Sequence, residues 1–170
     1  MSWLGYAGLS AVLMLPAAAS HATATPIFAP SQCAYSVAFP WQPALSQSTA
    51  ADGGIDVAAD LVRGGVRFSA GCLAAAPGQP ATPLAPADAT VRLTQMARAL
   101  GVQDAAIRPL PKLGAGCGAV EGKLGDNAQP YRIEARICIA ANATFIAETI
   151  THAGTTDSDS RKFLDSLTAK

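Results

Sequence analysis

The stretch Tyr131-Arg132-Ile133-Glu134-Ala135-Arg136-Ile137-Cys138-Ile139-Ala140 decides the fold of this chain. Aromatic or aliphatic residues occupy the odd positions from 131 to 139, and charged residues or cysteine occupy the even ones. Because successive residues of a β-strand point to opposite faces, this period of two predicts a strand with one apolar face. A turn sequence flanks this strand on each side. A strand-like run at 116–124 precedes it and another at 144–152 follows it, which indicates antiparallel neighbours joined by short links.

The first half of the chain holds three further strand-like runs. Residues 33–39 alternate and stop at Pro40-Trp41-Gln42-Pro43, as expected where prolines end a strand. The runs 55–62 and 66–73 are separated by Arg63-Gly64-Gly65, which predicts a β-hairpin.

Two helices complete the pattern. Residues 88–100 carry apolar positions at helical spacing and are followed by Gly101. Residues 156–166 start with Thr156 and Asp159, which resemble a capping box, and we expect Phe163, Leu164 and Leu167 to reach the core. The predicted order is three strands, a helix, three strands and a second helix, with links of hairpin length between strands. This order predicts an α+β fold: a predominantly antiparallel sheet with helices packed on it.

The chain begins with an uncharged apolar stretch, residues 4–19, ending near the small residues Ser20-His21-Ala22. This predicts a signal peptide over 1–22 and a mature N-terminus near Thr23, with cleavage after Ala19 or Ala24 and an uncleaved anchor as alternatives. Residues 23–32 read as a tether, and 33–170 as a single α+β domain. A connector at 74–87 has prolines at every third position from 77 to 86, which is typical of polyproline II.

Charge and composition narrow the possible partners. Twelve basic and twelve acidic residues give a formal net charge of zero, and no basic cluster exceeds Arg161-Lys162. We therefore expect no nucleic-acid partner. No second apolar run is long enough to span a membrane, so we expect no stable span after leader cleavage. Oligomeric state is left open.

All four cysteines follow the leader, which predicts disulfides in an oxidising compartment, periplasmic or secreted. Their spacing contains no Cys-x-x-Cys motif, which disfavours a zinc knuckle or a redox centre. A symmetric turn between residues 124 and 131 places Cys117 opposite Cys138 and leaves Cys33 to pair with Cys72. That register also sets Glu121 against Glu134, whereas a two-residue shift pairs opposite charges and leaves the cysteines diagonal.

Two end motifs carry a family resemblance. Tyr35-Ser36-Val37-Ala38-Phe39-Pro40, with Pro43 three residues on, and the closing Arg161-Lys162-Phe163-Leu164-Asp165-Ser166-Leu167 resemble the first strand and last helix of the PsbP-like (Mog/PsbP) fold family. The resemblance implies that fold over about residues 33–167 and a binding, assembly or accessory role. The cysteines, Trp41 and the proline-rich connector depart from the family pattern, and the motifs mark no common active site.

The side chains available for chemistry are few. His152 is the only histidine beyond the leader and is expected to be a solvated residue near a strand end. Asp157 and Asp159 are expected to cap a helix rather than bind a cation. The glycines at 114, 116 and 118 lack the dinucleotide fingerprint and instead predict a bend or close packing. We therefore expect no catalytic, cofactor-binding or metal-binding residues.

Trp41 is the aromatic residue that best fits a binding role. It sits between prolines just past a strand, where with Phe39 it could contact a partner; packing over the sheet edge is the alternative. These observations predict an exported bacterial, non-catalytic binding or accessory module of the cell envelope, whose partner is another envelope protein. The alternatives are a carrier of a small apolar ligand and a small hydrolase without a recognisable motif.

Overall fold

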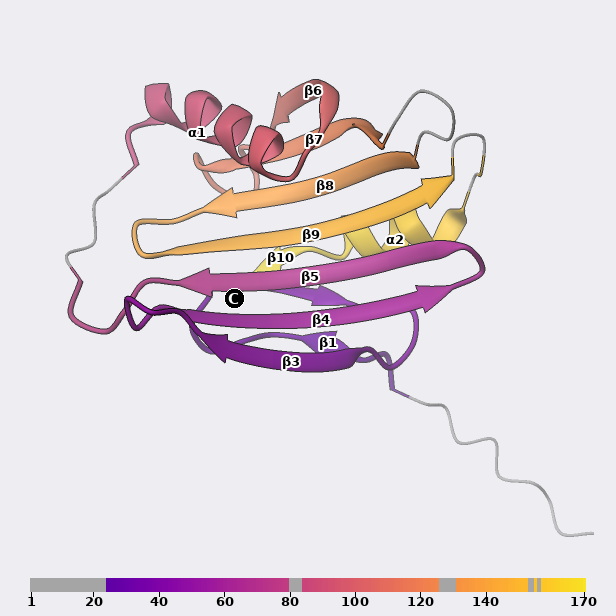
Figure 1. Cartoon of the computed structure of the whole chain (residues 1–170), viewed down its shortest axis with the longest axis horizontal. Coiled ribbons are helices and arrows are strands. Elements are labelled where there is room, and N and C mark those ends of the chain that lie inside the picture. Colours follow the sequence, from indigo (N-terminus) through magenta and orange to yellow (C-terminus); the bar gives the residue numbers. More distant parts are fainter. Residues whose placement is uncertain (1–23, 80–83, 126–130, 153–154, 156) are drawn as a thin grey trace, which may run out of the picture.

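The computed structural model describes residues 24–79, 84–125, 131–152, 155 and 157–170, and its main feature is a seven-stranded antiparallel sheet (Figure 1). The strands follow the order β3-β4-β5-β9-β8-β7-β6 across the sheet. Their bounds are β3 Ala44–Thr49, β4 Ile55–Arg63, β5 Val66–Ala74, β6 Gln103–Pro109, β7 Cys117–Leu124, β8 Tyr131–Ile139 and β9 Ala143–His152. The predicted α+β class with a predominantly antiparallel sheet is confirmed.

The two helices cover opposite faces of this sheet (Figure 1). Helix α1 (Pro86–Ala99) packs on the β6, β7 and β8 end of one face. Helix α2 (Ser158–Asp165) lies on the other face. There it is joined by a small sheet in the order β1-β2-β10, with β1 at Ile27–Phe28, β2 at Tyr35–Ala38 and β10 at Thr168–Ala169.

Each face has its own apolar core. The α2 face buries Phe39 and Phe68, whose rings both pack edge-on against Phe163, together with all four cysteines. The α1 face buries a smaller set, namely Leu93, Ala97, Val102, Val120, Ile133, Ala135, Ile137 and Ile146. The helix approaches the sheet closely because β7 carries glycine: a Cβ added at Gly118 would lie 2.6 Å from Cδ1 of Leu93. The predicted role of this glycine in close packing is confirmed.

The disulfides and the strand register agree with the expected pairing. Cys33 bonds to Cys72, and Cys117 bonds to Cys138, its direct cross-strand neighbour between β7 and β8. Glu121 and Glu134 do lie opposite each other in this register. Arg132 relieves their repulsion, because its guanidinium lies 2.7 Å from Glu134 and 3.9 Å from Glu121. A nearby cation thus allows the register that aligns the cysteines.

The predicted hairpin between residues 55–62 and 66–73 is β4-β5, and its turn residues Gly64 and Gly65 both have positive φ. The predicted helix at 88–100 is α1, and the three strands at 116–124, 131–140 and 144–152 are β7, β8 and β9.

Several expectations are corrected. The segment 23–32 is not only a tether, because Ile27–Phe28 pairs with β2 and Phe28 is buried. Strands β3 and β6 were not expected. The cap of α2 is Asp157, whose carboxylate accepts from the N–H groups of Asp159 and Ser160, rather than Thr156. The expected signal peptide over 1–22 and residues 80–83 of the expected connector lie outside the described residues.

Candidate functional site

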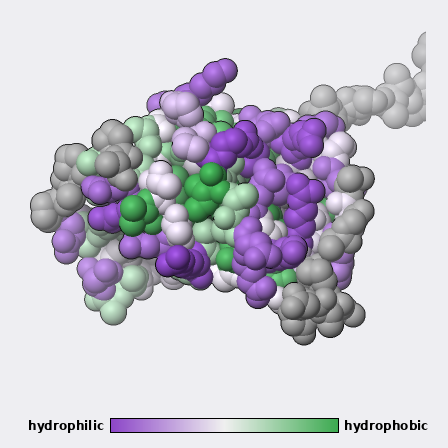
Figure 2. Space-filling model, turned by 90° about the horizontal axis from the view of Figure 1, so that it is seen from above, coloured by the Kyte–Doolittle hydropathy of each residue, from purple (hydrophilic) through white to green (hydrophobic). Residues whose placement is uncertain are grey.

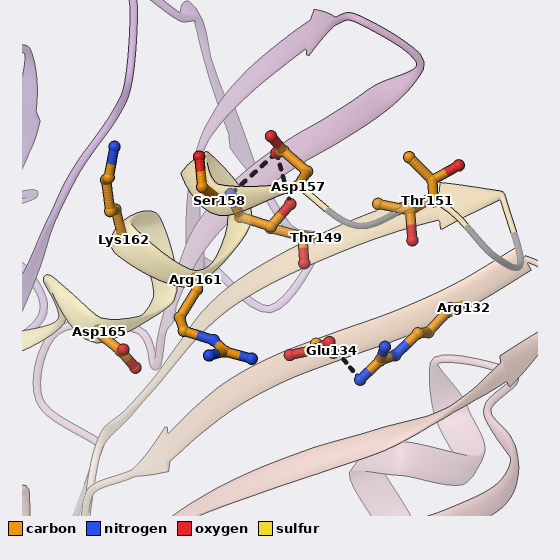
Figure 3. A pocket seen from close by; sticks show the side chains of 11 residues that line it. Arg132, Glu134, Thr149, Thr151, Asp157, Ser158, Arg161, Lys162 and Asp165 are labelled. Carbon is orange, nitrogen blue, oxygen red and sulfur yellow. Dashed lines mark hydrogen bonds and ion pairs between the residues drawn. The ribbon is translucent and has the colours of Figure 1, made fainter.

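A polar cleft of about 780 Å³ opens between α2 and the neighbouring strands β8 and β9 (Figure 3). It exists because β8 alternates: its odd positions face α1, so its even positions Arg132 and Glu134 face α2. From β9, Thr149 and Thr151 contribute hydroxyl groups, and both are buried. The rest of the lining comes from α2 and the residues before it: Thr155, Asp157, Ser158, Ser160, Arg161, Lys162 and Asp165.

Opposite charges balance within the cleft. Arg132, Arg161 and Lys162 are its cations, and Glu134, Asp157 and Asp165 are its anions. Figure 3 shows Arg132 and Arg161 directed toward the region of Glu134 from different elements. The guanidinium of Arg136, itself nearly buried beneath α2, lies 3.8 Å from the carboxylate of Asp165. A cleft with this lining suits a polar ligand or a polar protein surface carrying both signs of charge.

The N-terminus of α2 is fixed at the mouth of the cleft. Both the N–H and the hydroxyl of Ser160 donate to the Asp157 carboxylate, at 3.0 and 2.9 Å. The carboxylate therefore satisfies free N–H groups of the first helical turn and favours the positive end of the helix dipole. The expected capping role of Asp157 is confirmed, while Asp159 instead lies 3.3 Å from the ammonium of Lys162.

Trp41 lies beside this cleft. The guanidinium of Arg63 sits over its indole ring, 3.4 Å from the ring centroid, and the Trp41 residue remains 37% exposed. Hollows of about 220 and 280 Å³ flank the ring, and both are also lined by Asp159 of α2. The loop and the α2 N-terminus thus form one surface, defined here as the Trp41 surface: Pro40, Trp41, Arg63, Asp157, Asp159 and Lys162.

Phe39 does not belong to this surface. Its side chain is fully buried and packs edge-on against Phe163, with ring centroids 4.8 Å apart. The expected contact role of Phe39 is therefore wrong, because the alternation of β2 continues one residue further and directs Val37 and Phe39 to the same core.

His152 lies apart from the lining of the cleft. It ends β9, is exposed, and stacks on Tyr131 with ring centroids 4.5 Å apart. Among the described residues, no group of three His, Cys, Asp or Glu side chains is arranged to hold a metal ion.

A separate carboxylate is buried on the opposite face of the sheet. Glu148 follows the core residue Ala147 in β9 and therefore points to the α1 side, opposite Ser69 of β5. Burial raises its pKa, nearby Arg67 lowers it, and Asp60 raises it further. Oε2 of Glu148 has no hydrogen-bond partner among the described residues, while Arg67 and Asp60 pair with each other at 2.8 Å.

Sequence reasoning found Trp41 but not the cleft beside it. The alternating charges Arg132, Glu134 and Arg136 were visible in the sequence, where they indicated only the polar side of a strand. The signal that could have located the cleft is the turn from β9 into a short polar helix, which brings α2 back over that side.

Comparisons with known proteins give no family. No family model and no curated protein matches the chain. Among solved structures, a crystal structure from Bacteroides thetaiotaomicron matches with 12% identity and a TM-score of 0.45, over 85% of this chain. The chain spans about half (48%) of the length of that protein.

Proposed function

We propose that the protein is an exported bacterial binding or accessory module of the cell envelope that acts without catalysis and contacts its partner through the Trp41 surface. The observation that carries the proposal is a large aromatic side chain held at the surface beside a mixed-charge cleft. Tryptophan is among the residue types enriched at the few positions that dominate the affinity of protein interfaces.

The loop that carries Trp41 has little conformational entropy to lose when it binds a partner. Pro40 and Pro43 restrict the backbone on either side, and Arg63 covers one face of the indole. A cation over an aromatic ring stabilises that arrangement by roughly 0.5–1 kcal/mol at an exposed site. Because a rigid side chain loses less entropy on association, more of its contact energy appears as affinity.

The charges around Trp41 indicate the chemistry of the partner. Asp157 and Asp159 line the hollows beside the indole together with Arg63 and Lys162, so groups of both charge signs surround Trp41. A protein surface that offers an apolar pocket for the indole and complementary charges around it fits this pattern. A carrier of a small apolar ligand is less well supported, because the cleft between α2 and strands β8 and β9 is lined by ionic and hydroxyl groups.

The two disulfides fit an oxidising compartment outside the cytoplasm. Neither described helix has the length and apolar character needed to cross a membrane. We place the protein in the periplasm or outside the cell, after removal of residues 1–22. Intact-mass analysis of protein extracted from the envelope tests this: a mature N-terminus near Thr23 supports it, and a full-length mass in the membrane fraction contradicts it.

The binding proposal is tested by Trp41→Ala, with Tyr131→Ala as a matched control. Tyr131 is a similarly exposed aromatic residue (38%) that stacks on a polar neighbour, but the odd positions of β8 face the α1 side of the sheet, opposite α2 and the Trp41 surface. In a pull-down from native periplasm, we expect Trp41→Ala to lose partner proteins that wild type and Tyr131→Ala retain.

Thermal melts of the same variants separate binding from folding. Trp41 is only partly buried, so its removal should cost well below the roughly 3–5 kcal/mol of a core tryptophan. A sharp loss of stability would withdraw the surface as a binding site. Enzymatic turnover that survives purification to homogeneity would withdraw the non-catalytic assignment.

A Mog/PsbP-like fold remains our proposal for the family. Its support is that the two motifs behind the resemblance touch each other: Phe39 packs on Phe163, and the hydroxyl of Ser166 accepts from the N–H of Ala38 at 2.9 Å. Superposition of an experimental structure on members of that family tests it, and a different strand order in the main sheet would refute it.

A further inference from the structure

One edge of the main sheet is open. Among the described strands, β3 pairs only with β4, and all six of its residues are exposed. Its sequence Ala44-Leu45-Ser46-Gln47-Ser48-Thr49 has no charge, no proline and no irregularity in its register with β4, and Leu45 is 66% exposed. Such an edge is a template for pairing with another strand unless the protein blocks it.

The opposite edge is blocked. Strand β6 has a register shift between Gln103 and Ala106, a positive φ at Asp104 and a terminal proline, Pro109. Helix α1 also packs against β6, and the face seen from this side carries hydrophilic side chains interspersed with hydrophobic ones (Figure 2). Bulges, prolines and charges are the features that keep edge strands from pairing. Strand β3 carries none of these blocking features, and its outer edge is exposed.

The hydrogen-bonding direction of β3 follows from its turn. The N–H of Ala50 donates to the carbonyl of Gly54 at 2.8 Å, in the same register as the β3-β4 pairing. Because residues of an antiparallel strand alternate in hydrogen-bonding direction, Ala44, Ser46 and Ser48 also face β4. Leu45, Gln47 and Thr49 therefore direct their N–H and C=O groups away from the sheet.

We propose that β3 pairs antiparallel with β3 of a second copy, across a two-fold axis at Gln47, independently of the function proposed above. Leu45 then lies opposite Thr49 of the second copy, and Gln47 opposite its own equivalent. All the outward N–H and C=O groups are paired, giving about six backbone hydrogen bonds. The two sheets join into one continuous sheet, and the exposed Leu45 gains a cross-strand neighbour, the β-branched Thr49 of the second copy.

A second copy fits this edge for reasons of charge and symmetry. Residues 44–51 are uncharged, so the self-pairing places no like charges opposite each other, and the net charge of the chain is zero. An isologous contact uses the same patch on both copies and closes after two, which avoids fibre formation. A short strand pair buries little area, so the dimer dissociates on dilution.

Sedimentation velocity over a dilution series of the oxidised, envelope-extracted protein tests the proposal. We expect a mass that approaches twice that of the monomer at high concentration. Gln47→Lys sets two like charges opposite each other across the axis and should weaken association roughly fivefold. Gln47→Glu should weaken it similarly, and an equal mixture of the two variants should associate more tightly than either alone.

Ala106→Lys adds the same charge to the blocked edge at another exposed position and should leave association unchanged. Circular dichroism melts verify that each variant folds. A monomer mass at every concentration overturns the proposal, as does equal weakening by Gln47→Lys and Ala106→Lys, or failure of the charge-swapped mixture to recover.

Discussion

Removal of the Cys33–Cys72 disulfide by the double substitution Cys33→Ala and Cys72→Ala should destabilise the protein by about 4 kcal/mol. The estimate follows from the entropy that a closed loop removes from the unfolded chain, since this bond spans 39 residues. The same calculation for Cys117–Cys138, which spans 21 residues, gives about 3 kcal/mol. Because a domain of this size is stable by only about 5–15 kcal/mol, either loss is large.

The two disulfides differ more in their position in the fold than in their expected contribution to stability. Cys33 precedes β2 of the small sheet, whereas Cys72 lies in β5 of the main sheet, so this bond connects two layers. Cys117 and Cys138 join adjacent strands that already pair along their length. Loss of the first bond should therefore speed amide exchange in β2 and β10, and loss of the second should not.

Urea denaturation followed by circular dichroism measures the free energies, and hydrogen exchange with mass spectrometry locates the loosened segments. The reasoning fails if the Cys33→Ala and Cys72→Ala variant loses less than about 1 kcal/mol, well below the loop-entropy value. It also fails if β2 is equally protected in both double variants.

Two further predictions concern single carboxylates. Glu148→Gln should stabilise the protein at neutral pH by about 1.4 kcal/mol for each unit by which burial raises the pKa of Glu148. The folded protein holds this proton to a higher pH than the unfolded chain, so wild-type stability falls as pH rises from the ordinary glutamate pKa to the raised one. Thermal melts across that pH interval should show the stability of the variant relative to wild type growing with pH and then levelling off. A stability difference that stays constant with pH would contradict this prediction. Asp157→Ala should cost about 1 kcal/mol by removing the α2 cap, while Asp157→Asn should largely preserve stability and Asp159→Ala should cost only a few tenths. Equal losses for Asp157→Ala and Asp159→Ala in urea melts would refute the capping assignment.

The parts of the fold that bury one face could be predicted from the sequence. Strand β8 alternates because its odd residues meet α1 and its even residues do not, and the Gly64-Gly65 turn supplies the positive φ that a tight hairpin needs. Strand β3 was missed because an edge strand with all residues exposed carries no hydrophobic period. Strand β6 was missed because Pro109 reads as a strand breaker, although proline is tolerated at an edge.

The candidate site could be predicted only in part. Trp41 was identified from its flanking prolines, a local signal. The cleft needs Arg132 and Glu134 of β8 to meet α2, and that meeting depends on strand order, which no local pattern encodes. Phe39 was misplaced because the proline after it suggested that the strand had already ended, whereas its side chain still follows the alternation.

The small sheet has a consequence for the order in which the chain folds. Strand β2 pairs on one side with β1 and on the other with Thr168–Ala169, about 130 residues later in the chain. Under the export proposed above, a chain that leaves a membrane pore N-terminus first exposes Cys33 and Cys72 long before β10. Thiol oxidation can then link the early segment to β5 while β2 still lacks its second neighbour. The disulfide therefore holds the incomplete small sheet against the main sheet before β10 pairs with β2.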